Sequence, residues 1–124
     1  MAIANRTLTF ARAVVAASGT SVVATNGGSA PVPDNCHTIL VTNPSTTIVL
    51  LVGMGVAPAA LTAGVNAQRV PPGATLTLGV GIRGSMRGAM DESTDSGSGL
   101  IFDSIGGAVT GEITYENIVG GGGL

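Results

Sequence analysis

Alternation of apolar and polar residues is the clearest pattern in the chain, and it is sharpest over 74–82 and 108–117. In the first run one parity holds Ala74, Leu76, Leu78, Val80 and Ile82, and the other holds Thr75, Thr77, Gly79 and Gly81. In the second run Val109, Gly111, Ile113 and Tyr115 alternate with Thr110, Glu112, Thr114 and Glu116. Successive side chains of a strand point to opposite faces, so each run predicts a strand with one buried face.

Further strands are predicted over 20–25, 37–42, 46–54, 66–70 and 99–104, from short runs rich in β-branched and apolar residues. The run 46–54 is apolar on both parities, which predicts a strand covered by the core on one side and by a neighbour or the N-terminal segment on the other. The segment 7–15 alternates loosely and fits a strand, a short helix or an extended arm. Seven or eight short strands without a convincing helix predict an all-β fold, an antiparallel β-sandwich of jelly-roll or Greek-key type.

Two turns are predicted from proline and glycine. Asn43, Pro44 and Ser45 separate the runs 37–42 and 46–54, and this turn chemistry predicts a hairpin. Before the strand 74–82, Pro71 fixes φ, Pro72 extends the chain and Gly73 allows a positive φ.

The domain organisation is read from glycine, proline and polar segments. Residues 26–35 contain two glycines and two prolines and resemble a linker. The first thirty residues are therefore expected to form an extended N-terminal arm or peripheral strands, and residues 31–119 the β-sandwich domain. Residues 84–99 are polar and predict an exposed loop, and 120–124 predict a flexible glycine-rich tail.

The chain has few charged residues, and this limits the classes of partner that are expected. Charged residues make up 10 % of the 124 residues, lysine is absent and the net charge is −2, against a usual charged share of about 25 %. Five dispersed arginines do not form the basic stripe that nucleic acid requires, so no nucleic-acid partner is expected. The longest apolar stretch, 48–61, contains two glycines and a proline and is shorter than the ~20 residues of a membrane-spanning helix, so no membrane partner is expected.

Candidate chemistry is weak. Cys36 and His37 are adjacent, so on a strand they point to opposite faces, and zinc would need further ligands. Asp91, Glu92 and Asp95 lack the alternating order of a calcium loop. We therefore expect no catalytic residues, no metal site and no cofactor, and a protein that is not an enzyme.

A small surface with so few charges favours permanent assembly. The candidate inter-subunit contacts are Arg12, Leu51, Gly79, Gly81, Arg83 and Arg87. The two glycines would let a neighbouring backbone approach closely. Arg83 and Arg87 have two interpretations: charges that keep a loop and sheet edge soluble, or anchors that pair with acidic residues of a neighbouring subunit.

A family resemblance rests on two segments, which together cover about a third of the chain. The matching positions are Asn43, Pro44, Ser45, Val52, Gly53, Arg69, Val70, Pro71, Pro72, Gly73, Thr75 and Leu76. This pattern resembles the small β-sandwich proteins of tailed-bacteriophage virions, and is most similar to capsid decoration, or cement, proteins. Leu51 stands where that family often has tyrosine.

The resemblance implies a non-enzymatic protein on the capsid surface of the virion. It would bind the major capsid protein, stabilise the shell and associate with itself, as a homotrimer. Two alternatives stay open: a neck or tail-associated phage structural protein, and a secreted carbohydrate-binding or adhesin β-sandwich module.

Overall fold

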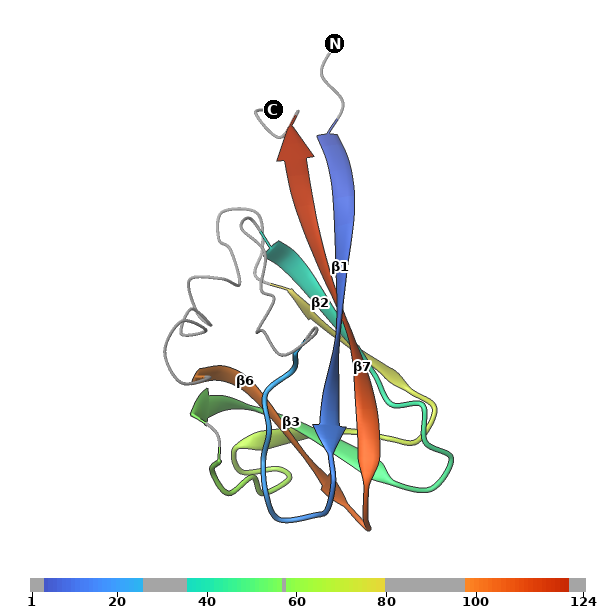
Figure 1. The fold of residues 1–124 in the computed structure, drawn as a ribbon, viewed down its shortest axis with the longest axis vertical. Coiled ribbons are helices and arrows are strands. Elements are labelled where there is room, and N and C mark those ends of the chain that lie inside the picture. The colour runs from blue at the N-terminus through green and yellow to red at the C-terminus, as the bar shows by residue number, and fades with distance from the viewer. Residues whose placement is uncertain (1–3, 26–35, 57, 80–97, 121–124) are drawn as a thin grey trace.

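The computed structural model describes residues 4–25, 36–56, 58–79 and 98–120, which form seven strands in two antiparallel sheets (Figure 1). The four-stranded sheet has the order β1 (Ala4–Val15), β7 (Val109–Gly120), β2 (Cys36–Thr42), β5 (Thr75–Gly79). The three-stranded sheet has the order β4 (Ala67–Val70), β3 (Val49–Val56), β6 (Ser98–Ile105). The all-β prediction is confirmed for the described residues, which contain no helix.

The core lies between the two sheets and is built by the predicted alternation. Among its largest buried side chains are Ile39, Val41, Ile113 and Tyr115 from the four-stranded sheet and Leu50, Val52 and Phe102 from the other. The odd residues 109–115 of β7 are buried while its even residues 110–116 reach solvent. Leu76 and Leu78 of β5 pack against the core while Thr75 and Thr77 are exposed. Burial of each large apolar side chain contributes about 1.5–3 kcal/mol, so these faces hold the sheets together.

Strand β1 buries Ala11, Ala13 and Val15 on one face and exposes Leu8, Phe10, Arg12 and Val14 on the other. Ala11 and Ala13 are buried, whereas Phe10 is 60 % exposed. Ala13 lies opposite Gly111 of β7, and a β-carbon at Gly111 would come within 2.9 Å of the Leu50 side chain. Leu50 thus fills the space between the sheets at Gly111, beside Ala13, and the larger Val15 is buried two residues further along this face of β1.

The first quarter of the chain belongs to the sandwich. β1 pairs with β7 along its whole length, and the predicted strand 20–25 consists of two isolated bridges, in which Val22 pairs with Phe102 and Thr25 with Arg12. Residues 4–25 are therefore hydrogen-bonded to strands of both sheets. Residues 26–35 and 121–124, expected to be a linker and a tail, lie outside the described residues.

The hairpin prediction for 37–54 is wrong. β2 pairs with β5 and β7, whereas β3 pairs with β4 and β6, so the Asn43 turn is a corner at which the chain changes sheet. The Asn43 side chain is fully buried and holds this corner. Its Nδ2 donates to the carbonyl oxygens of Ile48 (2.7 Å) and Val70 (2.9 Å), and its Oδ1 accepts from the Ser45 N–H (3.0 Å).

The second predicted turn lies against the same corner. Gly73 has φ = 75°, as the Pro71-Pro72-Gly73 sequence predicts, and the Ala74 N–H donates to the Pro71 carbonyl oxygen (3.0 Å). The Gly73 N–H also donates to the Asn43 carbonyl oxygen (2.9 Å). The two turns, thirty residues apart in sequence, thus form one unit, while the rings of Pro44, Pro71 and Pro72 stay exposed.

Strand β3 is covered on both sides, as its two apolar parities predict. Leu50 and Val52 face the core, and Leu51, on the opposite face, is only 3 % exposed. The chain itself provides cover on that face: the Leu61 side chain lies against Gly53, and the Ser21 hydroxyl binds the Ala59 N–H (2.7 Å).

A buried carboxylate fixes the segment after β1 to strand β6. Asp103 is 3 % exposed, and its Oδ1 accepts from the N–H groups of Gly19 (3.0 Å) and Ser104 (2.8 Å). Beside it the Ser18 hydroxyl accepts from the Gly107 N–H (3.1 Å) and lies 3.2 Å from the Ser104 hydroxyl. This cluster joins residues 18–19 to residues 103–107, two segments that are distant in sequence.

Replacement of Asp103 by Ala is expected to lower the free energy of unfolding by about 2 kcal/mol, because it leaves two N–H groups without their acceptor. Asp103→Asn keeps an oxygen at Oδ1 and is expected to cost about 1 kcal/mol or less. Urea denaturation of both variants measures the difference. Equal losses would contradict a role through these two hydrogen bonds.

Candidate functional site

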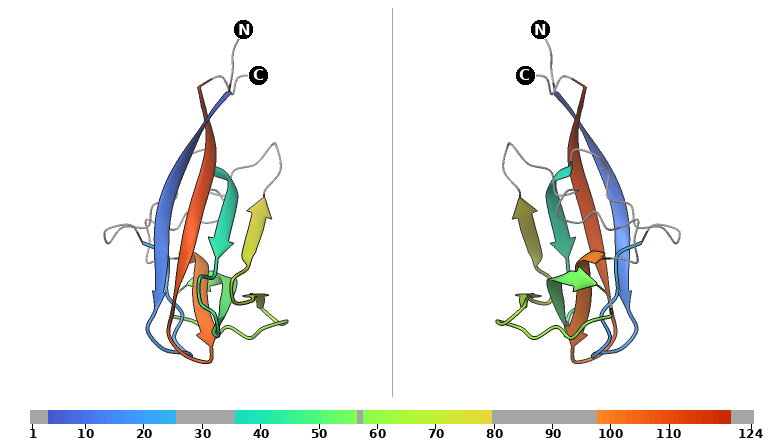
Figure 2. Two further views of the ribbon diagram at one scale, coloured as in Figure 1. Left: turned by 90° about the vertical axis from the view of Figure 1, so that its right-hand side faces the viewer. Right: turned by 90° about the vertical axis from the view of Figure 1, so that its left-hand side faces the viewer.

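The outer face of the four-stranded sheet is a broad surface dominated by threonine. The register aligns Phe10, Thr114, Leu40 and Thr77 in one row and Arg12, Glu112, Thr42 and Thr75 in the next. All eight side chains are exposed or half-buried. Figure 2 shows the four strands side by side on this face, with the smaller sheet behind part of it.

The edge strand β1 adds apolar side chains to this surface. Leu8 is 51 %, Phe10 60 % and Val14 59 % exposed, and all three have the parity of Arg12. Their neighbours across β7 are polar: Glu116, Thr114 and Thr110. One edge of the face is therefore apolar, and its centre is polar.

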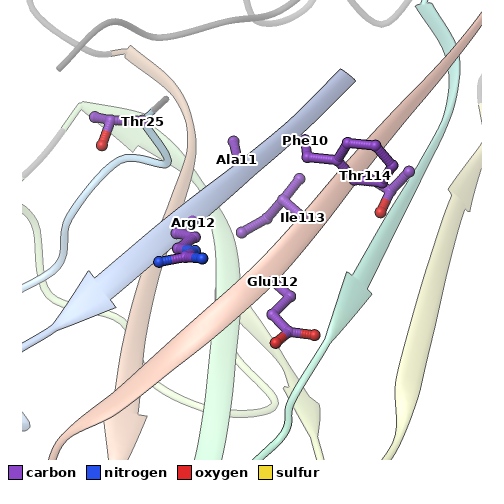
Figure 3. Close-up of a pocket in the computed structure, with 7 residues that line it drawn as sticks. All are labelled: Phe10, Ala11, Arg12, Thr25, Glu112, Ile113 and Thr114. Atoms are coloured by element: carbon purple, nitrogen blue, oxygen red, sulfur yellow. The ribbon is translucent and has the colours of Figure 1, made fainter. Parts of the chain in front are cut away.

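A hollow of about 540 Å³ lies around the middle of β1 (Figure 3). Ala11 and Ile113 line it together with the outward residues Phe10, Arg12, Glu112, Thr114 and Thr25. Arg12 and Glu112 lie directly opposite each other in the β1–β7 register, and Thr25 borders Arg12 on the other side through two backbone hydrogen bonds. The hollow combines one exposed aromatic ring with a cation, an anion and two hydroxyl groups.

The chemistry of this hollow is that of binding. Its side chains can offer a stacking surface, guanidinium donors, carboxylate acceptors and hydroxyl groups. The lining residues include no histidine or cysteine. In the part of the chain that the structure describes, no group of three His, Cys, Asp or Glu residues is placed to hold a metal ion, and no helix is long and apolar enough to cross a membrane.

The predicted contact residues are dispersed. Arg12 lies on the outer face, and Gly79, the last residue of β5, pairs with Thr38 on the same sheet. Leu51 is buried within its own chain, on the other sheet, which leaves it little surface for a neighbour. Gly81, Arg83 and Arg87 lie outside the described residues.

Sequence reasoning missed the residues that characterise this surface. Phe10 and Leu8 alternate with threonines, so the pattern gave no reason to place them on the outside. Among the described glycines, Gly53 and Gly111 are those at which a β-carbon would come within 3.0 Å of another atom, and those atoms belong to the same chain. One signal was available in the sequence: residues 11–16 include three alanines and two valines, and such small residues indicate that one face of the strand packs in a narrow space.

The comparisons with known proteins give no relative. No family model, curated protein or solved structure matches this chain.

Proposed function

We propose that this chain is a non-enzymatic structural protein of a tailed-phage virion, located on the capsid surface, where it decorates and cements the shell by binding major capsid subunits. The observation that carries this proposal is the outer face of the four-stranded sheet, with its rows of threonine, its apolar edge and its few charges. The resemblance of 43–53 and 69–76 to virion β-sandwich proteins supports it. In this proposal the sandwich is of the jelly-roll or Greek-key type of those proteins.

The proposed mechanism is burial of sheet surface across the seams between capsid subunits. The uncharged part of this face, on β2 and β5, loses little solvation free energy when it is covered, because desolvation is most costly for ions. Each Å² of apolar surface removed from water contributes about 25 cal/mol. Threonine hydroxyls can both donate and accept, so they can pair with backbone groups of a shell subunit.

Shell binding is the test of this proposal. Thr77 is exposed on the outer face, and Thr77→Glu is expected to weaken binding by about ten-fold or more, because it places a charge in the buried contact. Val65, 81 % exposed in the turn before β4, supplies the control, since Val65→Glu lies away from this face and is expected to leave binding unchanged. Co-sedimentation with shells of the same phage's major capsid protein, together with shell melting temperature, measures both.

A shell that binds neither wild type nor variants, and that melts at the same temperature with and without the protein, would refute the cementing role. Binding to assembled necks or tails but not to shells would favour the neck or tail-associated alternative.

The hollow favours a second candidate, a carbohydrate-binding module. Phe10 offers a ring for stacking on a sugar, beside Arg12 and Glu112 as hydrogen-bonding partners. If this candidate is correct, the wild type binds immobilised glycans and Phe10→Ala loses that binding, while shells are not bound.

A further inference from the structure

The outer edge of β1 presents backbone groups that have no partner among the described residues. The Arg12 N–H donates to the Thr25 carbonyl oxygen (3.0 Å) and the Thr25 N–H donates to that of Arg12 (2.8 Å), so both backbone groups of Arg12 point away from β7. Residues of an antiparallel strand alternate between the two sides, so Leu8 and Phe10 also direct their N–H and C=O outward. No described segment lies along the edge from Ala4 to Phe10 (Figures 1 and 2).

This edge has few of the features that prevent strands from pairing, and its charged residues are Arg6 and Arg12. β1 contains no proline and no lysine, and its twelve pairs with β7 run without a bulge. Leu8 and Phe10 add exposed apolar side chains along the same stretch. A long regular edge of this kind is a template for another strand.

We propose that a second copy of this chain pairs with this edge, β1 against β1, antiparallel about a two-fold axis at Thr7. The open stretch runs from Ala4, where β1 begins, to Phe10, the last outward-directed residue before Thr25 pairs with Arg12, so its midpoint is Thr7. This register pairs Phe10 with the partner's Ala4. It also pairs Leu8 with the partner's Arg6, so every outward backbone group of the stretch gains a hydrogen bond.

The residue types at the paired positions of the two copies complement each other in this register. Phe10 comes to lie beside the partner's Ala4, which in each chain is opposite Gly120, so the largest residue of the edge meets the smallest. In the next row of paired positions, Glu116 of β7 is opposite Leu8, and Leu8 is opposite the partner's Arg6. The register therefore places an acidic residue of one copy and an arginine of the other in the same row, two strands apart. A two-fold axis repeats both matches, which argues for a second copy as the occupant.

The contact is independent of the proposed capsid role and differs from the expected homotrimer. In a ring of three copies, each contact joins two different surfaces of the chain. An edge that pairs with the same edge of another copy joins only two copies. Shell binding and self-association can therefore fail separately.

Two exposed residues on one face of β1 give a matched test. Phe10 lies in the paired stretch and Val14 beyond it, and their exposed fractions are 60 % and 59 %. In sedimentation-velocity experiments on the full chain over a concentration series, the wild type should form dimers. Phe10→Lys should raise the dimer dissociation constant by about ten-fold or more, and Val14→Lys should change it by less than about two-fold. Melting curves check that each variant is folded.

Disulfide trapping tests the register. In a Cys36→Ser background, Thr7→Cys lies on the axis, so two copies should link under mild oxidation. Two copies of Thr9→Cys lie four residues out of register, about 13 Å apart along the strands, and should not link. A wild type that stays monomeric or forms only trimers would overturn the proposal. So would equal effects at Phe10 and Val14, or equal linking of the two cysteines.

Discussion

Asn43→Ala is expected to lower the free energy of unfolding by about 3–5 kcal/mol, because two buried carbonyl groups lose their donor at once. Asn43, which follows β2, is fully buried, and its Nδ2 donates to the carbonyl oxygens of Ile48, just before β3, and Val70, the last residue of β4, so it ties the end of β2 to the three-stranded sheet. Asn43→Asp keeps the size of the side chain but points acceptors at both carbonyls, so it should cost at least as much. Urea denaturation of the purified variants measures both losses.

Asn66 provides the matched control. It too donates from Nδ2 to a carbonyl, that of Ala60 (2.9 Å), and accepts at Oδ1 from the Thr62 N–H (2.6 Å), but it is exposed. Water can replace these partners, so Asn66→Ala is expected to cost about 1 kcal/mol or less. If Asn43→Ala and Asn66→Ala were equally mild, or if Asn43→Asp were neutral, the corner would not depend on the Asn43 amide.

Gly53→Ala is the second large expected loss, about 2–3 kcal/mol, because the added methyl group overfills a packed layer. A β-carbon at Gly53 would lie 2.6 Å from the Asn66 carbonyl oxygen and 2.7 Å from Leu61 Cδ2. The carbonyl belongs to the backbone of the turn before β4, so relief requires that turn to move away from β3. Thermal and urea unfolding measure the loss.

Gly111→Ala is the comparison, since its β-carbon would meet only the Leu50 side chain within 3.5 Å. A side-chain end can shift more easily than backbone, so a loss of about 1–2 kcal/mol is expected. In the double variant Gly53→Ala, Leu61→Ala the clash with Asn66 remains, and stability should not return. Recovery of stability in that double variant would mean that the clash with Leu61, and not the clash with the Asn66 carbonyl oxygen, destabilises Gly53→Ala.

The candidate site shows which of its residues can be predicted from sequence patterns and which cannot. Arg12 was identified from sequence as a contact residue and lies on the outer face, beside the hollow. Phe10 was not identified, because its alternation with threonines predicts a strand but does not predict which of the two faces of that strand is buried. That choice depends on packing between the two sheets, where Ala11, Ala13 and Val15 of β1 join the core.

The sequence by itself determined the all-β class, the alternating faces of β5 and β7, the two-sided burial of β3 and the positive φ of Gly73. These features follow from the two-residue repeat of a strand and the conformational freedom of single residues, which are local. Only the tertiary structure decided that the Asn43 turn is a corner rather than a hairpin, that β1 lies within the sandwich, and that its large side chains face outward. Those outcomes depend on contacts between segments distant in sequence, whose summed free energy a local pattern does not contain.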